Sequence, residues 1–283
     1  MKVIAEALQI LTHALEKAAS IPYARRQAEE ILCDVLSCDR LSLYINSRHP
    51  LKSEEWANCQ AYLARRLKGE PLAYIKGTIE FYNCLIHVNP SVLIPRQETE
   101  ILVDKIVHIL SKEDLRGKTL WDVCCGSGCI GIALKKRFPL LQVVLADQSK
   151  EALELASYNA NENKEDVVCL QGDLLTPFQG QKTHFFVCNP PYISEQEFEQ
   201  LDPDVREFEP KLALLGGVSG IEFYERLAKE LPVYLHPHSK VWFEIGYNQG
   251  EAVQALFKSP PWKNQHLEND WAGHNRFFFL ENE

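Results

Sequence analysis

The sequence lacks the features of a membrane or exported protein. No window of its 283 residues approaches 18 uninterrupted apolar residues, so we expect no segment that spans a membrane. A signal peptide would begin with a charged end and an apolar run. Residues Met1–Glu6 instead have the pattern of an amphipathic helix with an early acid. These absences predict a cytoplasmic protein.

The chain also has fewer basic than acidic residues and no Cys-x-x-Cys pair. Its 30 lysine and arginine residues against 39 acids give a formal net charge of −9, whereas proteins that hold nucleic acid usually carry a basic face. We therefore expect a protein or small-molecule substrate and no stable nucleic-acid binding. The nine cysteines form no Cys-x-x-Cys pair, which predicts reduced thiols in a cytosolic enzyme and no metal site.

What the chain does contain is enough apolar sequence for a core, 46% of its residues, and enough length for one large domain and a smaller one. Up to about residue 70, apolar residues recur at helical spacing in three stretches, with Pro22 and Pro50 between them. The pattern predicts a helical domain over residues 1–70. Such a domain is either a solubilising cap or a module that binds a macromolecular partner.

The pattern changes after Gly69. Residues Tyr74–Phe81 and Cys84–Val88 alternate like strands around a turn at Tyr82–Asn83, which predicts a β-hairpin linker over residues 71–95. A helical run then extends to Leu110. After Gly117, predicted strands and helices alternate to the end of the chain, which predicts an α/β fold with a parallel sheet covered on both faces. The predicted strands are 119–123, 142–146, 167–170, 185–188, 241–245, 265–267 and 276–280.

A glycine-containing loop, Asp122–Cys129, separates the first of these strands from its helix. Ligands of doubly wound folds collect at the carboxyl ends of strands, and glycine lets the backbone approach them closely. The next strand ends at Asp147, whose carboxylate can accept both hydrogen bonds of a ribose diol. Residues Gly126–Gly131 also fit the dinucleotide pattern Gly-x-Gly-x-x-Gly. However, an acid at Asp122 suits a ligand with an amine and a sulfonium better than a pyrophosphate. We therefore favour S-adenosylmethionine over NAD, with a simple glycine turn as the remaining alternative.

The run Asn189-Pro190-Pro191-Tyr192 directly follows an apolar strand. By average composition it should occur by chance in about one chain of this length in a thousand. A planar NH2 group conjugated to a carbonyl or ring is a poor nucleophile, so a catalyst must hold its N–H donors and present the nitrogen. The Asn189 amide oxygen can accept one N–H and the Pro190 carbonyl the other. Both prolines fix these acceptors in advance, and Tyr192 can offer a flat face. We call Asn189–Tyr192 the clamp.

Several runs together resemble the peptide chain release factor glutamine methyltransferases (the HemK/PrmC family), over nearly the whole chain and most densely from residue 69 to 100. These runs are Gly69–Gly77, Asn89–Glu100, Asn189–Tyr192, Glu209–Pro210, Ala213–Leu214, Gly216–Gly217, Gly220, Glu244–Gly246, Gln249, Asp270, Gly273 and Arg276. The resemblance implies a Rossmann-like class I methyltransferase domain over residues 96–283. It also implies methylation of the side-chain nitrogen of the glutamine in the Gly-Gly-Gln motif of bacterial class 1 release factors, and hence a role in translation termination.

The resemblance also assigns site residues. The residues implied to contact S-adenosylmethionine are Cys124, Cys125, Gly126, Ser127, Gly128, Asp147, Leu174 and Asn189. The clamp residues Asn189, Pro190, Pro191 and Tyr192 would hold the glutamine, with Asn189, Pro190 and Tyr192 in catalytic roles. The chain departs from the family at positions 124 and 125, where cysteines replace glycine and threonine, and at Gln97, where proline is common. Leu174 can pack against adenine but cannot stack as an aromatic residue would.

Two other classes of substrate also carry a planar nitrogen: a glutamine of a ribosomal protein and adenine in DNA or RNA. A sister enzyme methylates a glutamine of a ribosomal protein, but the run Ile94–Glu100 favours the release-factor branch. An adenine-N6 methyltransferase of DNA or RNA is disfavoured by the net charge of −9. A non-catalytic adaptor that only binds the cofactor would have no use for the clamp.

Overall fold

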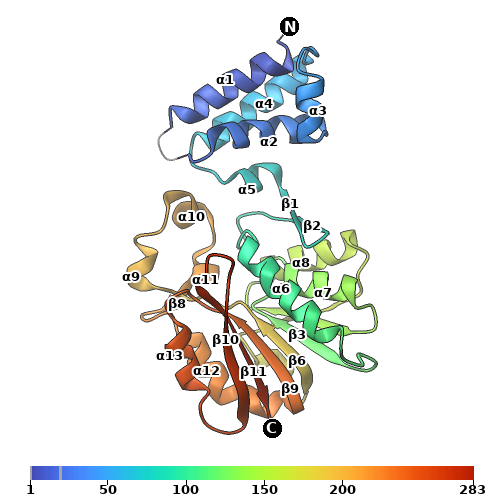
Figure 1. Ribbon diagram of the computed structural model, residues 1–283, viewed down its shortest axis with the longest axis vertical. Coiled ribbons are helices and arrows are strands. Elements are labelled where there is room, and N and C mark those ends of the chain that lie inside the picture. Colours follow the sequence, from blue (N-terminus) through green and yellow to red (C-terminus); the bar gives the residue numbers. More distant parts are fainter. Residues whose placement is uncertain (1, 19–20) are drawn as a thin grey trace. The chain divides into compact units, whose positions relative to one another are not determined.

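The computed structural model describes residues 2–18 and 21–283. By their internal contacts these residues form two compact units (Figure 1). The helical unit extends to Gly77 and also includes Pro203–Phe208, whereas the predicted first domain ended at residue 70. The α/β unit comprises Thr78–Asp202 and Glu209–Glu283. Among the described residues, no helix combines the length and apolar character needed to cross a membrane.

The helical unit is built on the predicted apolar stripes. Its elements are α1 (Ile4–Glu16), α2 (Ala24–Leu36), α3 (Arg40–Ile45), α4 (Ser53–Arg66), α5 (Leu72–Lys76) and α10 (Pro203–Phe208). Leu11, Leu15, Ile31 and Leu32 are fully buried and share one apolar cluster. Burying each such side chain stabilises the unit by about 1.5–3 kcal/mol.

The strand predicted over Tyr74–Phe81 is wrong in its first three residues, which belong to helix α5. Gly77 ends this helix in a left-handed conformation, with φ of 78°, as helices commonly end. The hairpin itself is confirmed: β1 (Thr78–Phe81) pairs with β2 (Cys84–His87) in antiparallel register. The turn residues Tyr82 and Asn83 both have positive φ, which is typical of a two-residue hairpin turn.

The α/β unit contains the predicted sheet, in which seven strands follow the order β10-β11-β9-β6-β3-β4-β5. The strands are β3 (Thr119–Val123), β4 (Gln142–Asp147), β5 (Val168–Gln171), β6 (Thr183–Cys188), β9 (Leu235–Glu244), β10 (Trp262–Asn269) and β11 (Asn275–Asn282). The central pairs are parallel, and only β11 and β10 run antiparallel to their neighbours. The fold class is therefore confirmed as α/β.

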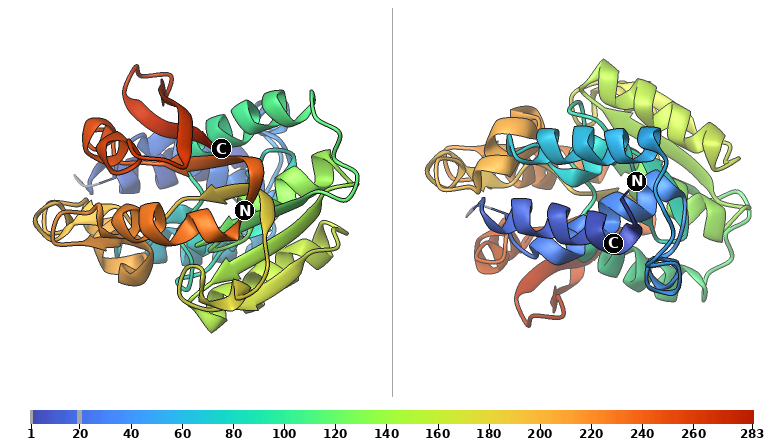
Figure 2. Two further views of the ribbon diagram at one scale, coloured as in Figure 1. Left: turned by 90° about the horizontal axis from the view of Figure 1, so that it is seen from below. Right: turned by 90° about the horizontal axis from the view of Figure 1, so that it is seen from above.

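Helices cover both faces of this sheet (Figure 2). The remaining elements are α6 (Gln97–Leu110), α7 (Cys129–Arg137), α8 (Lys150–Glu162), η1 (Thr176–Phe178), α9 (Glu195–Phe198), α11 (Lys211–Leu214), α12 (Glu222–Glu230), η2 (Leu231–Tyr234) and α13 (Gly250–Leu256). Tyr224 of α12 and Val253 of α13 pack with Phe186 and Phe243 on one face. On the other face, Gly131 of α7 lies against Leu145 of β4.

A short parallel pair, which the sequence did not predict, follows the clamp. β7 (Ile193–Ser194) pairs with β8 (Leu215–Gly217). This pairing brings the glycines of β8 against the clamp: a Cβ at Gly216 would lie 2.6 Å from the Pro191 carbonyl oxygen. Only glycine fits at this position, since real Cβ atoms do not approach so closely.

Candidate active site

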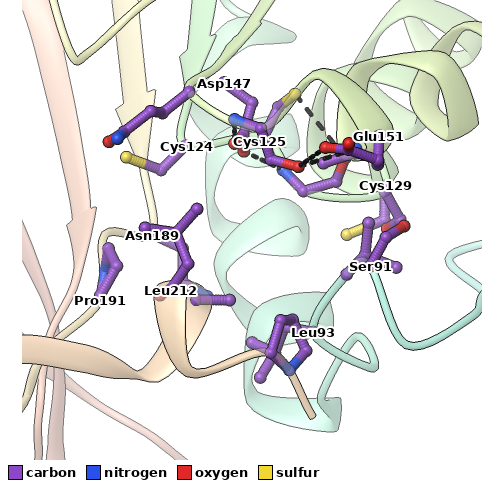
Figure 3. Close-up of a pocket in the computed structure, with 18 of the residues that line it drawn as sticks. Ser91, Leu93, Cys124, Cys125, Cys129, Asp147, Glu151, Asn189, Pro191 and Leu212 are labelled. Atoms are coloured by element: carbon purple, nitrogen blue, oxygen red, sulfur yellow. Dashed lines mark hydrogen bonds between the residues drawn. The ribbon is translucent and has the colours of Figure 1, made fainter.

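A cavity of about 320 Å³ opens at the carboxyl ends of the parallel strands (Figure 3). Strands β3, β4 and β6 each contribute the loop that follows them, which is where ligands bind in doubly wound folds. The predicted site residues among those that line the cavity are Cys124, Cys125, Gly126, Ser127, Asp147, Leu174, Asn189 and Pro191. The fold thus brings together most of the residues selected from the sequence, over a span from 124 to 191.

The loop after β3 has the backbone of a ligand-binding turn. Cys124, Gly126 and Gly128 have φ of 59°, 52° and 78°. No atom lies within 4 Å of a Cβ built at Gly126, so its backbone faces open space. Cys124 occupies a left-handed position that costs a non-glycine residue about 1–2 kcal/mol. The cysteine lines the cavity.

Gly128 of the loop and Gly131 of α7 serve packing. A Cβ at Gly128 would lie 3.0–3.1 Å from side-chain atoms of Leu145, Ala156 and Ile132, and one at Gly131 would lie 2.3 Å from Leu145. Neither residue lines the cavity. Gly128, which the resemblance places at the cofactor, thus allows α7 to begin close to the sheet.

Asp147 lies at the end of β4 and joins two loops of the cavity. Its Oδ2 accepts the Gly126 N–H at 2.9 Å, and its Oδ1 accepts the Ser149 N–H at 2.9 Å. Burial raises the pKa of this carboxyl, while the backbone hydrogen bonds lower it. Each carboxylate oxygen has a second lone pair that can accept a further hydrogen bond, so Asp147 can still hold a hydroxyl group of a ligand.

Asp122, the acid that favoured a ligand with an amine and a sulfonium, does not line the cavity. Its side chain is fully buried beneath the loop, and its Oδ2 accepts the Gly131 N–H at 2.8 Å. Burial raises its pKa to about 7, and the nearby Asp147 adds to this effect. The acid therefore joins β3 to α7.

Asp122→Asn should change how stability depends on pH. Between about pH 4 and pH 7 the folded chain keeps a proton on Asp122 that the unfolded chain releases, so the free energy of unfolding falls as the pH rises. Asparagine does not titrate, so this fall should be smaller in the variant by an amount on the order of a few kcal/mol.

Urea unfolding followed by tryptophan fluorescence, at about pH 5 and about pH 8, measures the effect. Glu154→Gln serves as the control, because Glu154 is an exposed carboxylate on α8 with 66% of its side chain accessible. Equal pH dependence in wild type and Asp122→Asn would contradict the prediction.

The clamp follows β6 directly. Asn189 and Pro191 line the cavity, while Pro190 is buried and is not among its lining residues. Tyr192 does not line the cavity either. Its hydroxyl donates to Glu244 Oε1 at 3.3 Å, and its carbonyl oxygen accepts from Gln249 Nε2 at 2.7 Å. The clamp is therefore anchored behind the cavity through its last residue.

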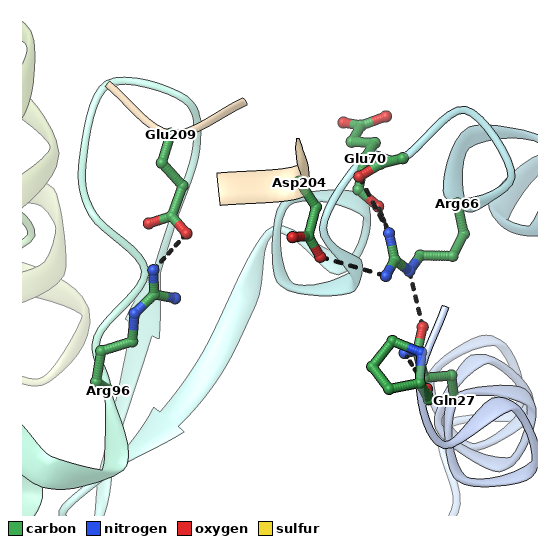
Figure 4. A network of polar contacts seen from close by, with 8 residues as sticks. Gln27, Arg66, Glu70, Arg96, Asp204 and Glu209 are labelled. Atoms are coloured by element: carbon green, nitrogen blue, oxygen red, sulfur yellow. Dashed lines mark hydrogen bonds and ion pairs between the residues drawn. The ribbon is translucent and has the colours of Figure 1, made fainter. Parts of the chain in front are cut away.

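The remaining wall comes from two distant segments whose roles the sequence did not reveal. Leu93 and Leu212, labelled in Figure 3, both line the cavity. Glu209 joins the segments: its Oε2 accepts the Ile94 N–H at 3.0 Å, and its carboxylate pairs with Arg96 (Figure 4). The run Asn89–Glu100 and the pair Glu209–Pro210 were noted for their resemblance alone. Their physical meaning is this partly buried ion pair, which joins two segments of the cavity wall.

The segment just before Glu209 belongs to the helical unit. Within that unit, Arg66 is 3% exposed, and its guanidinium donates to Gln27 Oε1 at 2.8 Å and to the Gly69 carbonyl at 3.0 Å. It also pairs with Asp204 at 3.5 Å (Figure 4). A buried arginine requires such partners, and Asp204 is 138 residues away along the chain.

Family models match both units. A model described as the PrmC N-terminal domain matches residues 6–77, and one described as the methyltransferase small domain matches residues 97–202. Among solved structures, a 16S rRNA N2 G1207 methyltransferase of Thermus thermophilus, in complex with AdoMet and guanosine, has a TM-score of 0.52 at 13% identity. The match covers 73% of this chain and 50% of that one. This likeness concerns the fold.

Relatives that match most of the chain have a higher sequence identity than this structure. A release factor glutamine methyltransferase of Chlamydia trachomatis serovar L2 is 44% identical over 263 residues, which cover 93% of this chain and 89% of the relative. The enzyme of the same name from Geobacter sulfurreducens is 41% identical over 234 residues, with 83% and 81% covered. Such identity over nearly full length, with the two matched domains in order, shows that the chain belongs to the release factor glutamine methyltransferase family.

Proposed function

We propose that this chain transfers a methyl group from S-adenosylmethionine to the side-chain amide nitrogen of the glutamine in the Gly-Gly-Gln motif of bacterial class 1 release factors. The observation that carries the proposal is the position of Asn189, at the edge of a cavity that also contains Asp147. An amide acceptor and a ribose-binding carboxylate in one cavity suit methyl transfer to a planar nitrogen. The relatives' names supply the class of substrate.

The cavity residues fit the cofactor. Asp147 can accept hydrogen bonds from a ribose diol, and the bare backbone at Gly126 leaves room beside it. Leu174, Ile130 and Phe223 supply apolar wall against which adenine can pack. The cavity volume of about 320 Å³ lies within the range of small-molecule sites. When bound, S-adenosylmethionine supplies an electrophilic methyl group on a sulfonium.

The chain's own residues position the nucleophile. The lone pair of a glutamine amide nitrogen is delocalised into its carbonyl, so the nitrogen reacts only when it is held in line with the methyl group. Asn189 accepts one N–H through its side-chain oxygen, and the Pro190 carbonyl accepts the other. Since both prolines fix φ, these acceptors need no reorganisation. Most of the rate then comes from orientation. As the nitrogen bonds to the methyl carbon, the bond from that carbon to the sulfonium sulfur would break, and the nitrogen would then release its proton to solvent water.

The proposed function assigns a role to each unit. We propose that the helical unit recognises the body of the release factor, because one glutamine cannot distinguish one protein from another. We propose that residues 1–70 recognise the substrate, residues 71–95 form the linker, and residues 96–283 carry out methyl transfer. Release factors act in translation, so the proposed site of action is the cytoplasm, without stable nucleic-acid binding.

Incubation with radiolabelled S-adenosylmethionine and separate samples of release factor, ribosomes and DNA tests the proposal. We expect label on release factor, and none on release factor whose Gly-Gly-Gln glutamine is replaced by alanine. Label on a ribosomal protein alone would indicate the sister activity. Label on DNA or RNA with release factor unlabelled would show that the assignment is wrong.

A further inference from the structure

Two residues behind the cavity hold Tyr192 at separate points. The Gln249 side-chain amide donates to the carbonyl oxygens of Tyr192 and Gly220, at 2.7 and 3.2 Å. Its own oxygen accepts the Gly246 N–H at 2.9 Å. Glu244 instead accepts the Tyr192 hydroxyl at 3.3 Å. Gln249 therefore fixes the backbone of the last clamp residue, and Glu244 fixes its ring.

Glu244 also reaches a residue that lines the cavity. Its Oε2 accepts the Thr99 hydroxyl at 2.8 Å, and Thr99 belongs to the cavity wall at the start of α6. Glu244 is 1% exposed, and burial raises its pKa, while the Thr99 hydrogen bond and the Arg276 charge lower it. Burying a carboxyl group costs free energy, so packing of β9 does not explain why an acid lies here. The hydrogen bonds that this carboxylate accepts from the Thr99 and Tyr192 hydroxyls explain it.

The backbone of the clamp has no room to move on this side. A Cβ at Gly220 would lie 2.4 Å from the Tyr192 carbonyl oxygen, and one at Gly216 would lie 2.8 Å from the Tyr192 Cα. With the backbone confined in this way, the orientation of the Tyr192 ring depends on its own side-chain contacts. The hydroxyl is the polar end of that ring, and Glu244 is its hydrogen-bond acceptor.

We propose that Glu244 is a positioning residue for methyl transfer: it orients the Tyr192 ring through the phenol hydroxyl and links the clamp to Thr99. The inference rests on the proposed function, because the clamp is the part that holds the glutamine amide. Misalignment of a reacting group by about 1 Å can cost about 10²-fold in rate. Loss of Glu244 should therefore lower kcat and leave the KM for release factor and the affinity for S-adenosylmethionine nearly unchanged.

A double-mutant cycle tests the coupling. Glu244→Leu and Tyr192→Phe should each lower kcat about 10- to 100-fold, and the double variant should be no more than about 3-fold worse than Tyr192→Phe alone. Glu244→Gln keeps the side-chain shape and one acceptor, so it should recover part of the loss. Ser239→Ala is the matched control: it removes a buried hydroxyl from the same strand, β9, where Ser239 donates to the Thr183 carbonyl. It should leave kcat unchanged.

Equal losses from Glu244→Leu in the wild-type and Tyr192→Phe backgrounds would overturn the proposal, because a structural role does not depend on the hydroxyl. A second readout does not need activity. Incorporation of fluorotyrosine labels all 10 tyrosines, and the fluorine resonance missing from Tyr192→Phe belongs to Tyr192. Glu244→Gln should shift that resonance. If it stays in place, Glu244 does not orient the ring, whether or not release factor is the substrate.

Discussion

Asn189→Ala should lower the turnover of release-factor methylation about 10²–10³-fold, by analogy with the loss of one preorganised hydrogen-bonding group at a reacting atom. Asn189 lies at the edge of the cavity directly after β6, where its side chain would act on the reacting nitrogen. The body of the release factor would contact other surfaces. Turnover should therefore fall much more than binding, and steady-state kinetics with purified release factor measure the two separately.

Asn161→Ala provides the control, since Asn161 is an exposed asparagine on α8 and does not line the cavity. It should keep wild-type kcat and KM. Near-normal turnover in Asn189→Ala would mean that the clamp shapes a turn and does not act on the amide. A rise in KM without loss of kcat would show that Asn189 contributes to substrate affinity and not to the methyl-transfer step.

The sequence was sufficient for the sheet because its strands carry strong local signals. Thr119–Val123 is a run with three large apolar residues, ended by a glycine loop, and the observed strand β3 has these bounds. The strand prediction was wrong for the first residues of the hairpin, and the reason is also local. Tyr74, Ile75 and Lys76 alternate like a strand, yet all three lie in α5, which the left-handed Gly77 ends. A helix of five residues is too short for its apolar pattern to be distinguished from that of a strand.

The site was predictable only in part, because some of its roles depend on contacts across the fold. The cavity loops follow strands, and strand ends can be located from sequence. The hydrogen-bond partners of Glu244 cannot be located in this way, because Thr99 is 145 residues away and Tyr192 is 52 residues away. Glu244 was noted only for its resemblance to the family, and the hydrogen bond that Asp122 accepts from Gly131 was not predicted.

Asp147→Ala should greatly weaken the binding of S-adenosylmethionine. The loss removes the carboxylate proposed to hold the ribose diol, and each hydrogen bond to a charged group is worth about 1.5–3 kcal/mol. It also removes the acceptor of the Gly126 and Ser149 N–H groups, so the loops beside the cavity lose their common support. We expect a Kd at least about 10-fold higher, by calorimetry, with a smaller rise in Asp147→Asn because an amide keeps one acceptor oxygen.

Glu154→Ala is the matched control, since it removes an exposed carboxylate of α8 that does not line the cavity. Its Kd for S-adenosylmethionine should equal that of the wild type. Unfolding by urea separates the two effects of Asp147→Ala: a variant that stays folded and loses the cofactor supports the ribose contact. Full binding of S-adenosylmethionine by Asp147→Ala, or binding of NAD in its place by the wild type, would contradict the proposed cofactor site. Glu151 and Asp173 also line the cavity, but only Asp147 lies at the end of β4, where a ribose-binding carboxylate is expected in this fold, so neither should compensate for its loss.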